Sequence, residues 1–189
     1  MAFDGKKHSL AYSTKLDGGL CFSFISETDL DNGMLIAKGD LEEGEREIYK
    51  AELDITKAAY LVLNPAWQYD DSTYAKRYDE SYYFVGKCTP FRGYQLYPTR
   101  RYEVSADICA DTLMVGDFVV ATATGKLAKA ASATNAGNAF VGKVVAVPTH
   151  GFVYASGSAG NVDITSKTYV IEVVKNEDVA AAASNPSKP

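Results

Sequence analysis

Short apolar segments rich in β-branched residues recur along the C-terminal half of the chain, and turn residues separate them. Residues 102–106 alternate apolar and polar side chains, as a half-buried strand does. Short strands at this spacing, divided by glycine and asparagine turns, predict a mainly β fold with a small barrel or sandwich in the C-terminal half. The strands expected there cover residues 102–106, 118–121, 127–131, 140–147 and 169–174.

The N-terminal half contains fewer such segments, and we expect it to be irregular and rich in aromatic residues, with at most one or two short helices. Asp31-Asn32-Gly33 predicts a tight turn, because asparagine and glycine tolerate positive φ. Residues 42–52 fit either an amphipathic helix or an exposed strand, and periodicity does not decide between the two. The strands expected in this half cover residues 20–25, 34–37 and 59–63.

These patterns divide the chain into four expected parts. They are an N-terminal arm or lead-in over 1–30, an aromatic-rich β-containing region over 31–110, a C-terminal β-module over 111–175 and an extended tail over 176–189. The tail contains an alanine run followed by Asn-Pro-Ser-Lys-Pro, and no core can be built from it.

Tyrosine is concentrated between Trp67 and Tyr102. Eight of the thirteen tyrosines fall there, together with the single tryptophan, and Tyr74, Tyr78 and Tyr82 recur every four residues, as on a short helix. Tyrosine combines a large apolar face with a polar end and few rotatable bonds, which is why it concentrates at protein interfaces. The same rings could instead form the core of the protein, and both interpretations stay open.

The charge balance excludes some classes of partner. Nineteen lysines and arginines against 24 aspartates and glutamates give a net charge of −5 and an isoelectric point near 5.1. A nucleic-acid binder needs a basic face to displace counterions from phosphates, so we expect no nucleic-acid partner. No segment approaches the roughly 18 apolar residues of a membrane-spanning helix, and residues 1–7 lack the apolar core of a secretory signal, so no membrane partner is expected either.

Few residues of the sequence suggest a catalytic or metal-binding role. The three cysteines, Cys21, Cys88 and Cys109, are widely spaced, and we expect three buried thiols made in a reducing cytoplasm. Cys88 would act as a nucleophile only beside a base, so a small buried hydrophobe is the favoured role. No histidine or cysteine spacing matches a metal site, so no catalytic residue, cofactor or metal is predicted.

Four sequence segments in the C-terminal half carry a resemblance. They are Tyr102-Glu-Val-Ser-Ala-Asp107, Leu113-Met-Val-Gly-Asp-Phe-Val-Val120, Gly125-Lys-Leu-Ala-Lys-Ala130 and Phe140-Val-Gly-Lys-Val-Val145. In this order they resemble the decoration, or cement, proteins that cover the assembled heads of tailed bacteriophages. In that family a Val-Gly-Asp turn starts a strand, a Gly-Lys-Leu hairpin follows, and a Val-Gly-Lys-Val-Val strand returns across the barrel.

The resemblance implies a protein without catalytic residues. It would be made in the bacterial cytoplasm and added to the outer surface of an assembled capsid, with the major capsid protein as its partner. Self-association as a trimer would suit three-fold positions of such a lattice. The aromatic residues and the ends of the chain are the expected capsid contacts. The candidates are Phe3, Tyr12, Trp67, Tyr74, Tyr78, Tyr82, Asn176 and Pro189.

Two alternatives remain. The same β-module could belong to another structural component of the phage particle, in a head fibre, neck or tail. A carbohydrate-binding or hydrolytic module is the alternative from a different class, because carboxylates in an aromatic stretch can line a sugar site. The carboxylates concerned are Asp70, Asp71, Asp79 and Glu80.

Overall fold

The structure of the protein, a computed structural model, describes residues 8–13, 20–65, 82–134, 137–148, 152–155 and 162–179. It is mainly β, which confirms the predicted fold class. Within the described residues no helix is long and apolar enough to cross a membrane. The strands are β1 (Ala11–Ser13), β2 (Cys21–Ile25), β3 (Leu35–Leu41), β4 (Ile48–Glu52), β5 (Ala59–Val62), β6 (Phe91–Gln95), β7 (Arg101–Ser105), β8 (Phe118–Ala121), β9 (Leu127–Ala130), β10 (Phe140–Ala146), β11 (Phe152–Ala155), β12 (Val162–Ser166) and β13 (Thr168–Asn176).

Five strands from the N-terminal half close into a barrel in the order β2-β4-β3-β5-β6. β2 and β4 run parallel, whereas the other four pairs are antiparallel. The Asn32-Gly33 turn leads into β3 as predicted, and Gly33 has a φ of +92° that an L side chain rarely adopts. Residues 48–52 form a strand of this barrel, which decides between the two structures that the sequence left open.

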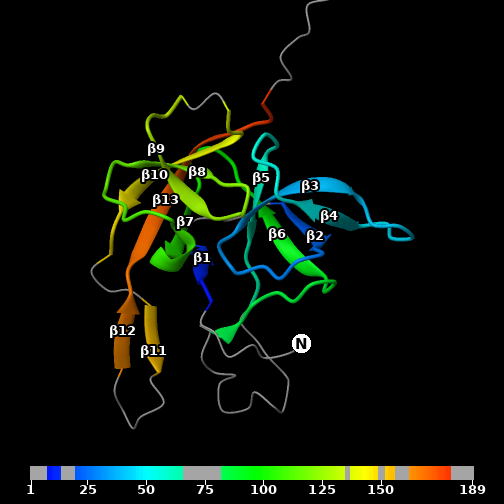
Figure 1. Cartoon of the computed structure of the whole chain (residues 1–189), viewed down its shortest axis with the longest axis horizontal. Helices are drawn as coiled ribbons and strands as arrows, with labels where there is room; N and C mark the ends of the chain where they lie inside the picture. Colours follow the sequence, from blue (N-terminus) through cyan, green and yellow to red (C-terminus); the bar gives the residue numbers. More distant parts are fainter. Residues whose placement is uncertain are drawn as a thin grey trace, which may run out of the picture.

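The C-terminal half forms a six-stranded antiparallel sheet in the order β1-β7-β13-β10-β8-β9. A separate ribbon of β11 and β12 extends away from it (Figure 1). All five strands predicted for this half are present. The closed barrel, however, lies in the N-terminal half, whereas the sequence placed a barrel or sandwich in the C-terminal half.

The expected boundary at residue 110 does not separate the two sheets. β7, expected within the aromatic-rich region, pairs with β13 and belongs to the C-terminal sheet. β1 and β2, expected in an N-terminal lead-in, are an edge strand of that sheet and a strand of the barrel. Local periodicity identifies a strand but not its partner, so the assignment of strands to sheets could not be predicted in this way.

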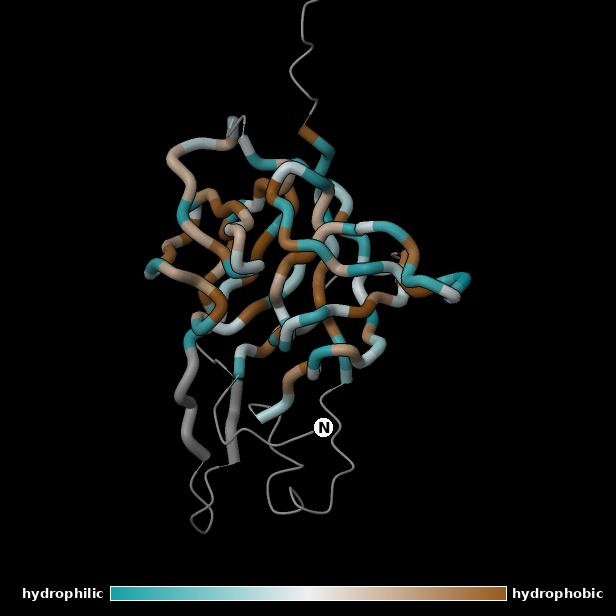
Figure 2. Tube along the Cα trace, turned by 45° about the vertical axis from the view of Figure 1, so that its right-hand side comes forward, coloured by the Kyte–Doolittle hydropathy of each residue, from teal (hydrophilic) through white to brown (hydrophobic). Residues whose placement is uncertain are grey.

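The barrel and the sheet share one wall, which strands β3 and β5 build. All four residues of β5 are buried, because Ala59 and Leu61 pack into the core shared with the sheet while Tyr60 and Val62 face the interior of the barrel. Successive side chains of a strand point to opposite faces, so this alternation requires apolar residues at every position. Hydrophobic segments accordingly run through the centre of the molecule, and hydrophilic segments mark many of its outer loops (Figure 2).

The N-terminal segment 8–13 joins the barrel to the sheet, and Ser9, Leu10 and Ala11 are buried in the junction. β1 pairs with β7, and the Leu10 amide donates to the Ser105 hydroxyl at 3.0 Å. On the barrel side, the Ser9 hydroxyl donates to the Asn32 carbonyl at 2.8 Å. This part of the expected arm is therefore an integral edge of the fold.

Asn176 closes the junction between barrel and sheet at the end of β13. Its side-chain oxygen accepts from the Ala59 amide at 2.7 Å, and its side-chain nitrogen donates to the carbonyls of Ala59 and Leu96 at 2.8 and 2.9 Å. The amide thus pairs with backbone groups just beyond the last residue pair of the β5–β6 ladder, Tyr60 and Gln95. The expected extended tail included Asn176, but this residue serves the interior of the fold.

The residues that follow are also held. The Val179 amide donates to the Thr56 carbonyl at 2.7 Å, and the Ala58 amide donates to the Asp178 carboxylate at 2.6 Å. Residues 176–179 therefore line the loop before β5, where the sequence predicted the start of an unpacked tail. This role could not be predicted from the sequence, because the side chains of Asn176 and Asp178 bond to the backbone of Ala59 and Ala58, more than a hundred residues away.

We expect Asn176→Ala to lower the free energy of unfolding by about 2 kcal/mol or more, because three backbone groups lose their partners at a partly buried site. Urea denaturation followed by circular dichroism measures this change. Glu177→Ala is the matched control, since its side chain is exposed and its backbone bond is retained; its effect should stay within about 0.5 kcal/mol. Equal losses in the two variants would contradict the role of Asn176.

Candidate functional site

Three of the predicted capsid contacts lie within the described residues, and they occupy separate elements. Tyr12 is in β1 opposite Glu103 of β7, Tyr82 is partly exposed ahead of β6, and Asn176 makes the internal bonds described above. Asn176 is therefore withdrawn as a surface contact. The others, Phe3, Trp67, Tyr74, Tyr78 and Pro189, lie outside the described residues, as does the helix suggested by the tyrosine spacing.

The cysteines differ from the expectation of three buried thiols. Cys21 and Cys88 are exposed, and only Cys109 is partly buried, next to the sheet core. Burial raises the pKa of the Cys109 thiol to about 12, and the negative charges of Asp107 and Asp111 add to the effect. At neutral pH this thiol is protonated and a poor nucleophile.

No group of three or more potential metal ligands is present among the described residues. The carboxylates of the alternative sugar site, Asp70, Asp71, Asp79 and Glu80, lie outside them. A polar pair that the sequence did not reveal joins the arm to the barrel: His8 Nδ1 lies 2.6 Å from Asp31 Oδ1, and the His8 ring stacks on Phe84 with centroids 4.7 Å apart. This geometry secures the N-terminal segment to the barrel turn.

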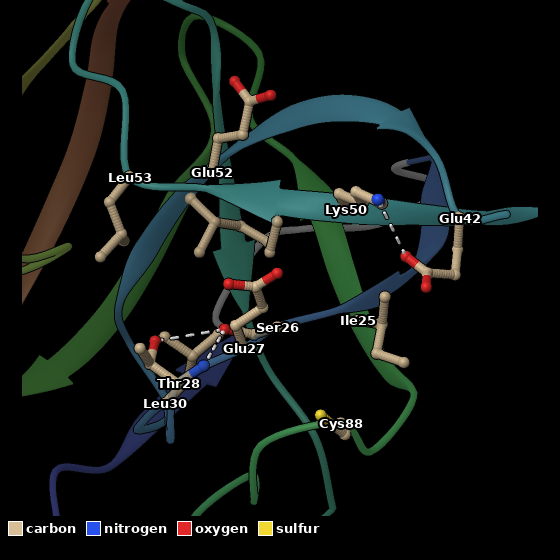
Figure 3. Close-up of a pocket in the computed structure, with 12 residues that line it drawn as sticks. Ile25, Ser26, Glu27, Thr28, Leu30, Glu42, Lys50, Glu52, Leu53 and Cys88 are labelled. Atoms are coloured by element: carbon tan, nitrogen blue, oxygen red, sulfur yellow. Dashed lines mark hydrogen bonds and ion pairs between the residues drawn. The ribbon is translucent and has the colours of Figure 1, made fainter.

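One end of the barrel contains a cavity of about 490 Å³ (Figure 3). β2 is paired with β4 as far as Ile25 opposite Lys50, and β4 continues to Glu52 after β2 has ended. The cavity lies at this end of the strand pair. Its lining consists of Ile25, Ser26, Glu27, Thr28, Leu30, Ile36, Glu42, Lys50, Ala51, Glu52, Leu53 and Cys88.

The floor and one wall of the cavity are fixed by packing and hydrogen bonds. Leu30 and Ile36 are each 2% exposed and belong to the barrel core. The Cys88 amide donates to the Ser26 carbonyl at 2.7 Å, and the Ser26 hydroxyl accepts from the Thr28 amide at 3.1 Å. Cys88 has a φ of +55°, an unusual conformation for a residue other than glycine, which this turn maintains. The cavity is therefore shaped before any ligand binds.

The charged groups of the cavity are unevenly paired. Lys50 Nζ lies 3.6 Å from Glu42 Oε2 at the rim, and Glu52 turns away to pair with Lys57 at 2.5 Å. The Glu27 side chain extends from the turn after β2 toward β4 (Figure 3), and no described side chain forms an ion pair with it. The cavity thus combines an apolar floor with an excess of negative charge.

Sequence reasoning missed this site because its lining comes from five separate stretches of the chain, none of which carries a motif. Comparisons of the chain with protein-family models, with curated proteins and with solved structures found no match.

The three thiols should react at two distinct rates. We expect Cys21 and Cys88 to be alkylated quickly at pH 8, and Cys109 to react only after unfolding, since its pKa of about 12 leaves almost no thiolate. Mass spectrometry of iodoacetamide-treated protein over time measures the three rates. Cys109→Ser should remove the slow phase alone, and three equal rates in the native protein would contradict the buried position of this thiol.

Proposed function

We propose that this chain is a non-enzymatic structural protein of a bacteriophage particle that binds the outer surface of the assembled capsid and stabilises it. The observation that supports the proposal best is the local structure of the segments that resemble decoration proteins. The Val-Gly-Asp turn, the Gly-Lys-Leu hairpin and the Val-Gly-Lys-Val-Val strand are consecutive parts of one sheet.

The turn at residues 114–117 has a defined geometry. Gly116 has a φ of +97°, the Asp117 amide donates to the Met114 carbonyl at 3.1 Å, and the Asp117 carboxylate accepts from the Met114 amide at 2.9 Å. β8 begins directly after this turn, and its hairpin to β9 contains Gly125 with a φ of +75°. β10 then pairs with both β8 and β13, so the returning strand lies in the middle of the sheet.

A capsid-stabilising role needs a preformed surface and no reaction. A protein that binds the assembled shell but not the free subunit favours assembly by mass action. The closely packed barrel and sheet present exposed apolar side chains, among them Met114 and Val115 at 65% and 63% exposure. A net charge of −5 suits an outer face of the shell, away from packaged DNA.

The proposal predicts selective binding to assembled shells. Empty capsids and unassembled capsid protein of the phage concerned would each be mixed with the purified chain and sedimented. We expect saturable co-sedimentation with capsids and an affinity for free subunits at least about tenfold lower, a difference of about 1.4 kcal/mol. Binding to isolated neck, tail or fibre components instead would favour another structural role in the particle, and hydrolysis of a glycan by the chain would contradict the proposal.

A further inference from the structure

We propose that the barrel-end cavity is the docking site for a basic side chain, an arginine or lysine, presented by the capsid protein. This inference rests on the proposed function. It specifies which end of the molecule faces the shell and which type of side chain the partner presents there. It comes from the volume of the cavity, its floor and the charge of Glu27.

The volume suits a side chain rather than a folded element. About 490 Å³ lies within the usual range for small ligands, roughly 300–1,000 Å³. Leu30 and Ile36 at the floor offer an apolar surface on which the methylene groups of a long basic side chain can pack. A short polar side chain would leave this floor without contacts.

The negative charge of the cavity favours a positively charged side chain. Lys50 is already near Glu42, whereas Glu27 projects over the cavity with no described side chain to neutralise it. A guanidinium or ammonium group beside Glu27 would form a charge-assisted hydrogen bond, while an acidic group would meet repulsion. Arginine is moreover enriched at protein interfaces.

Apolar side chains flank the cavity and can exclude water from such a contact. Leu53 lines the cavity at 38% exposure, and Leu41, at 44%, directly precedes Glu42 of the rim. Glu27 is exposed in the free chain, so a partner that covered these leucines would also reduce the screening of an ion pair at Glu27. Met114 and Val115 are more exposed but do not line this cavity, so they serve as the competing surface in the test.

The two exposed cysteines provide a footprint of the docked face. Cys88 lines the cavity, whereas Cys21 lies at the other end of β2. With capsids bound to the full chain, we expect alkylation of Cys88 to slow at least about tenfold and that of Cys21 to change less than twofold. Protection of Cys21 alone, or of neither thiol while binding persists, would overturn the inference and leave the proposed function standing.

The charge requirement has its own test. Glu27→Gln should weaken capsid binding about three- to tenfold and reduce its salt dependence, and Glu27→Lys should weaken it further. The isosteric control Glu177→Gln changes the same net charge at an exposed position outside the cavity lining and should bind like wild type. Equal effects of Glu27→Gln and Glu177→Gln, or a loss caused by Met114→Glu alone, would overturn the inference.

A measurement without capsids tests the electrostatics of the cavity directly. In Cys21→Ser protein, Cys88 should react several times faster with a cationic than with an anionic methanethiosulfonate, and Glu27→Gln should reduce this ratio. A ratio unaffected by Glu27→Gln would contradict the assignment. If the wild-type chain binds no capsid at all, the proposed function and the partner named here fail together, a result separate from every outcome above.

Discussion

The two-sided burial of β3 and β5 is the constraint on which the rest of the fold depends. Ala59 and Leu61 face the core shared with the sheet, and Tyr60 and Val62 face the interior of the barrel, so one strand contributes to both cores. Neither half can bury this wall alone, because each would expose the apolar face that the other half covers. The segment 8–13 and Asn176 add hydrogen bonds across the same junction. Barrel and sheet therefore form one cooperative unit.

The sequence predicted most strands but not their arrangement. Alternating apolar residues and glycine turns identify strands such as β7, β8 and β10, since these signals are local. β6 was missed because Gly93 weakens a strand pattern, yet glycine is required there: a Cβ atom at this position would lie 2.6 Å from the Phe24 ring. The closure of β2 through β6 into a barrel depends on pairings between distant residues, which no local pattern encodes.

The candidate site was predictable to a smaller extent. Aromatic composition between Trp67 and Tyr102 pointed to Trp67, Tyr74, Tyr78 and Tyr82, and all of these except Tyr82 lie outside the described residues. The cavity instead uses Glu27 and Leu30 after β2, Lys50 in β4 and the Cys88 turn, which come together only when the barrel closes. Asn176 was wrongly predicted to be a surface contact. A polar residue near an alanine-rich end carries no local signal that its side chain bonds inside the fold.

We propose that this chain covers the surface of an assembled shell, a claim that its copy number in purified particles can test. A closed symmetric shell repeats each surface position many times, so quantitative mass spectrometry should find on the order of hundreds of copies per virion. A count of about a dozen, the number expected for a single ring, or the absence of the chain from mature particles, would contradict the claim.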